Sequence, residues 1–322
     1  MNLTNILEKE KQNRKEFASS ARNAITLCMF ACALMLALQI ALSFLPLPSG
    51  NEVNDAVSDM IIYCGSICIP TVILSYCFKH FFKDINIDLP KRNNPKKPFL
   101  YIAGTLGVGY LTNLIIVSFF TDFFERHAID SGAPTLTIIG IILMYLTNAV
   151  LPAIIEEWAF RGVICKNLIP YNKAGAIILS SLLFGFMHIN PTTIVFTSIL
   201  GSLLAVCYVY SGSLKLPMLI HLINNGIATT FTIFVDTENP NSASTLISYF
   251  IVIVMIGFSI YGMIYYKKNG ITQKKISLKK PLIIGYKLSI VDFLTTFLLN
   301  AGIIPLFYTV YFIFIQFILY MI

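Results

Sequence analysis

The chain has 322 residues, of which 56% are hydrophobic and 12% charged, and its formal net charge is +7. A soluble domain carries roughly 25% charged residues, so this composition, with a mean hydropathy of +0.75, excludes an ordinary soluble protein. The apolar residues gather in runs of about 20, the length that crosses a hydrocarbon core about 30 Å thick. No segment alternates with the ten-residue rhythm of an outer-membrane barrel. We therefore predict an all-α fold, a polytopic transmembrane bundle of about eight to ten helices.

The expected elements follow one another with short polar connections. Eight spans are predicted, in chain order Ala24–Leu45, Met60–Phe78, Phe99–Phe120, Thr135–Ile155, Ala174–Ile189, Thr193–Tyr210, Leu216–Phe234 and Leu246–Tyr266. The apolar tail Pro281–Ile322 holds either one further span or a hairpin of two, and the sequence does not decide between them.

Two polar stretches divide the chain into three parts. Residues 79–98 are a linker with three prolines, and residues 267–280 are rich in lysine. We expect a cytosolic arm with two helices and a linker over residues 1–98, a catalytic helix core over residues 99–235, and C-terminal transmembrane helices over residues 236–322.

Basic residues gather in alternate loops, which predicts the orientation. They crowd the N-terminal arm, residues 79–98, the connection after the fourth span, and residues 267–280. The other loops hold acidic residues, with Arg126 as their one basic residue. We expect a cytosolic N-terminus and a multi-pass protein of a bacterial cell membrane. The net charge then reflects topology and contact with membrane lipid rather than a nucleic-acid partner.

Two adjacent carboxylates, Glu156 and Glu157, follow the fourth apolar run, and Arg161 comes four residues after the second. Charged groups at membrane depth are costly, so such a pair predicts a functional site. In a helix Glu157 faces Arg161, whereas Glu156 points about 100° away. Glu157 and Arg161 are equally compatible with a structural ion pair. Glu156 has no partner in its own helix and is the stronger functional candidate.

Two histidines interrupt later apolar segments. His188 shares a helix face with Phe184, and His221 shares one with Asn225. Each pattern alone is compatible with ordinary interhelical hydrogen bonding in a membrane. If the fourth helix continues to the turn Ile169–Asn172, Glu156 lies about 20 Å and His188 about 24 Å from that turn at 1.5 Å per residue. The two side chains are then expected near one level of a helical hairpin, and His221 near the cytosolic face.

The ordered motifs Glu156-Glu157-x-x-x-Arg161, Phe184-x-x-x-His188 and His221-x-x-x-Asn225 resemble the CPBP (Abi) family of CAAX-processing and bacteriocin-processing intramembrane proteases. The resemblance covers about residues 99–234 and implies that Glu156 and His188 activate water, while His221 and Asn225 stabilise the oxyanion. Glu157, Arg161 and Phe184 would then be secondary, structural residues. Members of the family are described both as metalloproteases and as metal-free glutamate proteases.

The residue types fit hydrolysis of a peptide at the cytosolic membrane face. Such hydrolysis needs a general base for water and donors for the developing oxyanion. If a metal such as zinc takes part, Glu156, His188 and His221 are the candidate ligands. We prefer catalysis without a cofactor, because Asn225 is a good amide donor and a poor zinc ligand. The alternative reading is a non-enzymatic transporter or a bacteriocin self-immunity protein that uses the same polar residues.

Overall fold

The computed structural model describes residues 3–73, 76, 102, 105–109, 137–188 and 191–234, with a few separate positions between 246 and 264. Within these residues every regular element is a helix. The predicted spans Phe99–Phe120 and Leu246–Tyr266 fall mostly outside the described residues, and the tail 281–322 falls wholly outside them. The all-α prediction is confirmed for the described part, and the count of eight to ten helices stays a prediction.

The first two helices form an antiparallel pair. Helix α1 spans Leu3–Ser43, and α2 spans Glu52–Tyr63 and continues into the π-helical segment η1, Cys64–Cys68. The Asn51 side chain caps α2 by accepting a hydrogen bond from the backbone N–H of Asn54 at 2.9 Å. The apolar stretch of this helix begins at Val53, earlier than the predicted Met60. Acidic residues in the first turn suit the N-terminal end of a helix, and the predicted span does not include these residues.

A long helix carries the two glutamates. It begins with α5, Ile138–Tyr145, and runs through η3, Leu146–Val150, α6, Leu151–Glu157, η4, Trp158–Cys165, and α7, Lys166–Leu168. The predicted continuation past the glutamates to the turn at Ile169 is therefore confirmed. Asn172 then caps α8, Lys173–Phe186, through the backbone N–H of Gly175 at 2.8 Å.

Two further helices complete the described bundle. Helix α9 spans Pro191–Ser211 and α10 spans Lys215–Phe234. Gly212, with a φ of 64°, stands in the short link between them, a backbone conformation that glycine adopts without the steric cost of a Cβ. The bounds of α8, α9 and α10 agree with the predicted spans to within a few residues.

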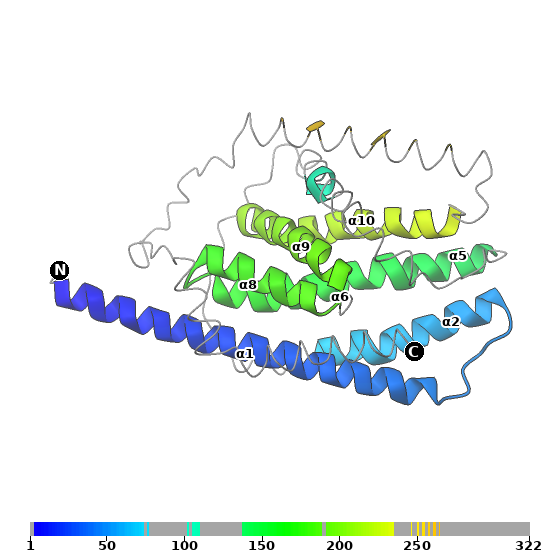
Figure 1. Ribbon diagram of the computed structural model, residues 1–322, viewed down its shortest axis with the longest axis horizontal. Coiled ribbons are helices and arrows are strands. Elements are labelled where there is room, and N and C mark those ends of the chain that lie inside the picture. Colours follow the sequence, from blue (N-terminus) through cyan, green and yellow to red (C-terminus); the bar gives the residue numbers. More distant parts are fainter. Residues whose placement is uncertain are drawn as a thin grey trace.

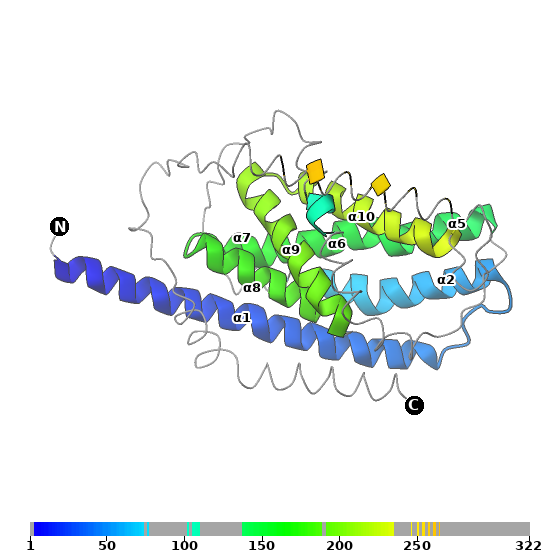
Figure 2. The same cartoon turned by 45° about the horizontal axis from the view of Figure 1, so that its top comes forward.

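The helices stack in three tiers, with α1 and α2 on one side, the long helix and α8 in the middle, and α9 and α10 on the other side (Figures 1 and 2). The main core joins the first two tiers and part of the third. It contains apolar residues from α1, η4, α7, α8 and α9, among them Ala24, Cys165, Leu168, Ala176 and Ala205, all completely buried.

Four helical stretches of the described chain are long and apolar enough to cross a membrane, and two more apolar helices are shorter. The four are Lys15–Leu42, Val53–Ile73, Ile138–Leu168 and Lys215–Ile233, and the shorter pair is Lys173–Phe186 and Thr193–Val209. Large apolar side chains such as Ile138, 77% exposed, and Ile139, 60% exposed, face outward, as expected for helices that contact lipid tails. The chain is a membrane protein.

Candidate active site

One side of the long helix holds a fully buried ion pair. Nη1 of Arg161 donates to Oε1 of Glu157 at 2.8 Å, and both side chains are completely buried. Nη2 of Arg161 also donates to the backbone carbonyl of Gly201 on α9 at 2.9 Å. The predicted contact between Glu157 and Arg161 is confirmed, and it also ties the long helix to α9.

The guanidinium also stacks on an aromatic ring. The central carbon of Arg161 lies 4.5 Å from the centroid of the Phe184 ring, within the range of a cation–π interaction. A Cβ at Gly201 would lie 2.9 Å from Cδ1 of Phe184 and 3.2 Å from Nη2 of Arg161. A side chain at this position would therefore force Phe184 to shift, because the backbone of α9 approaches both side chains closely.

His221 of α10 joins the same buried cluster. Its Nδ1 lies 2.9 Å from Oε1 of Glu157, and its side chain is almost completely buried. A carboxylate at Nδ1 favours the proton on that nitrogen, so Nε2 is left facing Oε2 of Glu156 at 3.9 Å. The contact with Glu157 was not foreseen from the sequence, which grouped His221 with Asn225 and, as a candidate metal ligand, with Glu156 and His188.

Glu156 points to the other side of the helix. Its side chain is 17% exposed, and Oε1 accepts a long hydrogen bond, 3.4 Å, from the hydroxyl of Tyr63 on α2. Its Oε2 is buried and has no hydrogen-bond partner among the described residues. The carboxylate of Glu156 is therefore much less constrained than that of Glu157.

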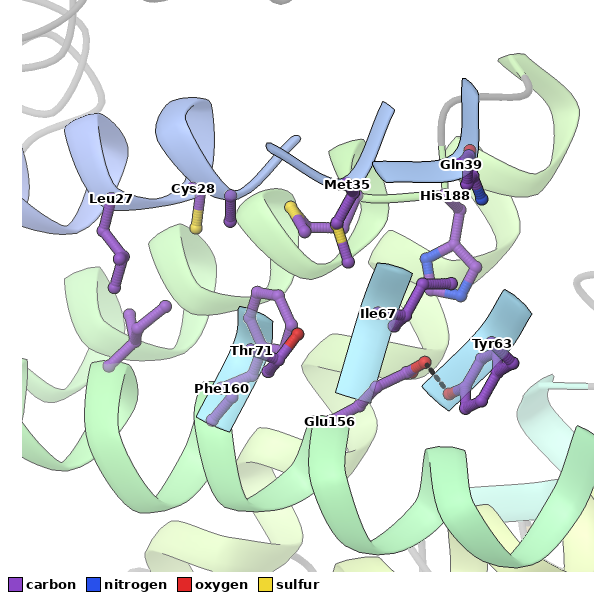
Figure 3. A pocket seen from close by; sticks show the side chains of 14 residues that line it. Leu27, Cys28, Met35, Gln39, Tyr63, Ile67, Thr71, Glu156, Phe160 and His188 are labelled. Carbon is purple, nitrogen blue, oxygen red and sulfur yellow. Dashed lines mark hydrogen bonds between the residues drawn. The ribbon is translucent and has the colours of Figure 1, made fainter. Parts of the chain in front are cut away.

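Glu156 and His188 line one pocket of about 310 Å³ between the first and second tiers. Figure 3 shows both side chains on its wall, with Tyr63 beside Glu156. The expectation that Glu156 and His188 lie at one level of the helical hairpin is confirmed. The pocket is lined by Leu27, Cys28, Ala31, Met35, Gln39, Tyr63, Ile67, Thr71, Glu156, Ala159, Phe160, Ile164, Met187 and His188.

Phe184 lies between the two histidines. Its ring centroid is 4.9 Å from that of His188 and 5.8 Å from that of His221, in edge-to-face arrangements. Nδ1 of His188 lies 2.9 Å from the backbone carbonyl of Phe184, a contact that favours a proton on Nδ1 and leaves Nε2 as an acceptor. Phe184 thus helps to orient the imidazole rings of both histidines.

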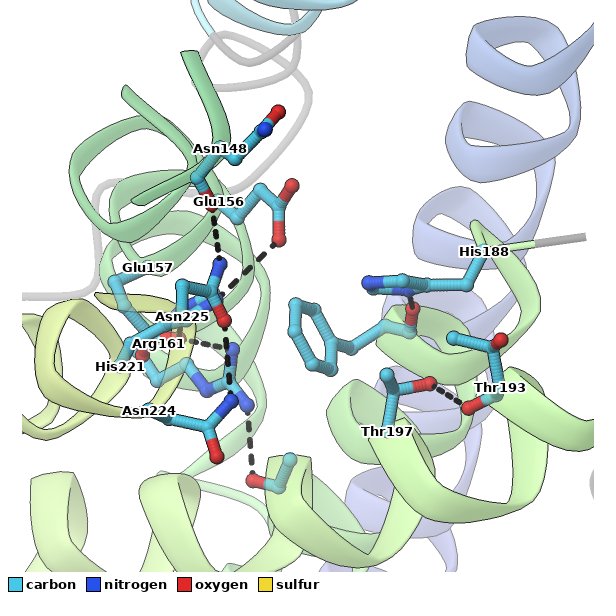
Figure 4. Close-up of polar contacts among 12 residues, drawn as sticks. Asn148, Glu156, Glu157, Arg161, His188, Thr193, Thr197, His221, Asn224 and Asn225 are labelled. Atoms are coloured by element: carbon cyan, nitrogen blue, oxygen red, sulfur yellow. Dashed lines mark hydrogen bonds and ion pairs between the residues drawn. The ribbon is translucent and has the colours of Figure 1, made fainter. Parts of the chain in front are cut away.

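Asn225 is oriented by two contacts (Figure 4). Its Nδ2 donates to the backbone carbonyl of Asn148 in η3 at 3.1 Å, and its Oδ1 accepts from Nδ2 of Asn224 at 3.1 Å. The carbonyl of Asn148 is accessible because Pro152, four residues later, has no N–H to donate to it. An amide nitrogen carries two hydrogens, so one remains for a ligand.

The π-helical segments coincide with this site. Arg161 lies in η4, Asn148 lies in η3, and Tyr63 directly precedes η1. Such segments are rare and occur frequently at functional sites, because they redirect side chains and backbone groups that a regular α-helix would keep in register.

Sequence reasoning missed Tyr63 and the carbonyl of Asn148. Tyr63 is one of 16 tyrosines and lies 93 positions from Glu156, and no local pattern marks it. For Asn148 a signal existed, because Pro152 inside an apolar helix implies an unused carbonyl four residues earlier.

The three candidate metal ligands are Glu156, His188 and His221. Among the described residues, no three His, Cys, Asp or Glu side chains form a group that could hold a metal ion. Glu156 and His221 approach each other, while Nδ1 of His188 contacts the Phe184 carbonyl. In this arrangement the three residues do not fit a shared metal site. Catalysis without a cofactor stays a prediction.

Comparisons with known proteins agree with the motifs. Residues 138–227 match the family model described as type II CAAX prenyl endopeptidase Rce1-like. The chain is also 24% identical over 233 residues to the membrane-embedded CAAX protease MroQ of Staphylococcus aureus, an alignment that covers 63% of this chain and 89% of the relative. No solved structure matches the chain. These matches support the resemblance of the three ordered motifs to the CPBP family of intramembrane proteases.

Proposed function

We propose that the chain hydrolyses a peptide bond near the cytosolic membrane face through water that is activated by Glu156 and His188. The observation that carries the proposal is the shared pocket, in which Glu156 is the one carboxylate among the described lining residues and His188 the one imidazole. A general base must reach its proton within hydrogen-bond distance, directly or through one water. The carboxylate of Glu156, whose side chain is 17% exposed and lines the pocket, is the group suited to that task.

His221 and Asn225 are proposed to stabilise the oxyanion of the tetrahedral intermediate. Nδ1 of His221 is occupied by Glu157, so Nε2 is the atom that faces the site. With Nδ1 bound to Glu157, Nε2 serves as a donor in the form of the ring that carries a proton on both nitrogens. Asn225 has one amide hydrogen beyond the one it gives to Asn148. Preorganised donors of this kind are usually worth about two to three orders of magnitude in rate.

The substrate is proposed to be a peptide segment at the membrane surface, either a CAAX-type C-terminus or a leader or bacteriocin-type peptide. The pocket walls support this, because most described lining residues are apolar and belong to helices that cross the membrane by length and composition. We place the N-terminus in the cytosol on the basis of the alternation of basic and acidic loops. The richness of the chain in Lys, Ile and Asn favours a bacterial cell membrane.

The direct test uses protein purified in detergent and a quenched peptide library. The wild type should hydrolyse part of the library, and Glu156→Gln should reduce the rate by about 10²–10⁴-fold, the range for removing a general base. Gln keeps the shape of the side chain, so thermal stability should change little. Equal rates in the two proteins would transfer the role to another residue or reject the protease proposal.

A matched comparison is Glu8→Gln, which removes an exposed carboxylate from the N-terminal arm, away from the pocket. Its hydrolysis rate should equal that of the wild type. If both variants lost the same activity, a general effect of charge on the purified protein would explain the loss, and Glu156 would have no special role.

A further inference from the structure

We propose that Tyr63 is a positioning residue that holds the carboxylate of Glu156 in the orientation needed to activate water. This inference rests on the proposed function. Tyr63 lies on α2, outside the residues 138–227 that match the family model, so neither the three motifs nor that match assigns it a role.

The contact between the two side chains is specific in its atoms. The phenol hydroxyl lies 3.4 Å from Oε1 of Glu156 and donates the hydrogen, because an ionised carboxylate only accepts. With Oε1 directed towards α2, the second oxygen, Oε2, points to His221 at 3.9 Å. One oxygen is thus restrained while the other faces the imidazole of the site, as Figure 4 shows for Glu156 and His221.

The wall of the pocket around Tyr63 offers little else that could restrain the carboxylate. The described lining residues from α1 and the helix of α2 are mainly apolar, and their polar members are Cys28, Gln39, Tyr63 and Thr71. Of these, Tyr63 donates a hydrogen bond to Glu156, and Figure 3 shows its ring beside that carboxylate. A carboxylate with free rotation would spend only part of its time in the reactive orientation, so a fixed donor raises the rate.

The backbone of the second helix fixes the position of the tyrosine. Tyr63 is the last residue of α2, and the π-helical segment η1 starts at Cys64. One turn later, the hydroxyl of the completely buried Ser66 donates to the carbonyl of Ile62 at 2.6 Å. Helix α2 packs on α5, and η1 packs on α1 and α6, so the hydroxyl is presented from a packed element and not from a loop. Side chains held on packed elements keep the geometry that catalysis needs.

The hydrogen bond is long for two oxygen atoms, and such contacts in ligand-free enzymes tighten when the reactive complex forms. The role is therefore expected in turnover more than in substrate binding. Removing the hydroxyl should lower kcat and leave KM near its wild-type value, because the pocket keeps its apolar walls and the aromatic ring.

The test compares Tyr63→Phe with Tyr145→Phe in purified protein against the most rapidly cleaved quenched peptide. Tyr145 is a matched control, since its hydroxyl is also partly buried and lies 2.6 Å from Oγ1 of Thr230, away from the pocket. We expect kcat of Tyr63→Phe to fall about tenfold, the rate effect of one lost hydrogen bond, with KM unchanged. Tyr145→Phe should keep kcat, and thermal unfolding of both variants is measured alongside.

Several results would overturn the proposal. An unchanged kcat in Tyr63→Phe shows that the hydroxyl positions nothing, and a raised KM with normal kcat shows that it contacts substrate instead. Equal losses of kcat in both tyrosine variants point to general packing. In each of these cases Glu156→Gln remains inactive, so the proposed function stands. If hydrolysis does not depend on Glu156 at all, the proposed function fails together with this inference.

Discussion

The two sides of the long helix place the same residue type in opposite surroundings. On one side Glu157 is completely buried, and its Oε1 is shared by Arg161 and His221 at 2.8 and 2.9 Å. On the other side Glu156 is 17% exposed, lines a pocket, and accepts one long hydrogen bond, 3.4 Å, from the part of the chain that the structure describes. The neighbours in sequence differ because a rotation of about 100° per residue sends them to different tiers of the bundle.

This difference separates support from chemistry. Glu157 is completely buried and binds a cation and an imidazole through Oε1, so it orients its partners and is closed to substrate. A carboxylate with an unengaged oxygen in a pocket can accept a proton from water. His221 connects the two sides, because Nδ1 contacts Glu157 and Nε2 faces Glu156. We call the Glu157 side of the long helix the sealed side and the Glu156 side the open side. The sealed side holds His221 in place, and the open side provides the carboxylate that reacts.

The largest expected effect on stability comes from breaking the sealed side. Arg161→Ala leaves Glu157 buried without its cation and removes the bond to the Gly201 carbonyl. Loss of one partner of a buried pair costs about 3–5 kcal/mol, so we expect lower abundance and a lower midpoint of thermal unfolding in detergent.

Lys166→Ala is the control for that experiment. Lys166 is a partly exposed cation one turn further along the same helix, and such surface changes usually stay within about 0.5 kcal/mol. If Arg161→Ala instead kept its stability and lost all hydrolysis, Arg161 would be shown to contact the substrate, and the division into a structural and a reactive side would be wrong.

A smaller effect is expected when the sealed side is crowded from α9. Gly201→Ala places a Cβ 2.9 Å from Phe184 and 3.2 Å from Arg161, and overpacking of this kind typically costs about 1–3 kcal/mol. Gly226→Ala on α10 is the matched control, since a Cβ there has no neighbour within 4 Å. The midpoint of thermal unfolding should be lower for Gly201→Ala than for Gly226→Ala. Equal midpoints would show that α9 shifts to make room for the new Cβ without a cost in stability.

The sequence predicts the different surroundings of Glu156 and Glu157 only in part. The separation of Glu156 from Glu157 and the pairing of Glu157 with Arg161 follow from helix geometry alone, and the structure confirms both. The level of His188 follows from counting residues along the hairpin. These are local relations, fixed within one helix or across one short turn.

The contacts that sequence reasoning missed join distant parts of the chain. Tyr63 meets Glu156 across 93 residues, and His221 meets Glu157 across 64. These pairs depend on how the helices stack on one another. The spacing of residues within one helix does not determine that stacking. The predicted start of the catalytic core at residue 99 stays a prediction, and helices from the first 73 residues supply one wall of the pocket. A single sequence does not show which apolar helix faces the site.

A modest effect is expected on the open side from Pro152→Ala. The new N–H can donate to the Asn148 carbonyl in the regular α-helical manner and so competes with the side chain of Asn225. A hydrogen bond contributes about 0.5–1.5 kcal/mol, which corresponds to a fall in kcat of roughly two- to tenfold. The helix itself gains a bond, so the unfolding midpoint should stay the same or rise.

A double-mutant cycle distinguishes this route from a general disturbance. In an Asn225→Ala background Pro152→Ala should have no further effect on kcat, because the amide it displaces is already gone. If the two losses simply multiply, Pro152 acts by another route and the Asn148 carbonyl does not orient Asn225.

The smallest expected effect is that of removing metal. Oε1 of Glu157 holds Nδ1 of His221, Nδ1 of His188 lies on the Phe184 carbonyl, and Asn225 is a better amide donor than zinc ligand. This arrangement favours hydrogen-bonding roles for the site, so we expect protein washed with a chelator to keep its rate of hydrolysis. Elemental analysis of the washed, active protein is the measurement, with His188→Ala beside it. One equivalent of zinc that follows activity through the washes and is lost in His188→Ala would show that His188 is a ligand, and would leave the protease assignment intact.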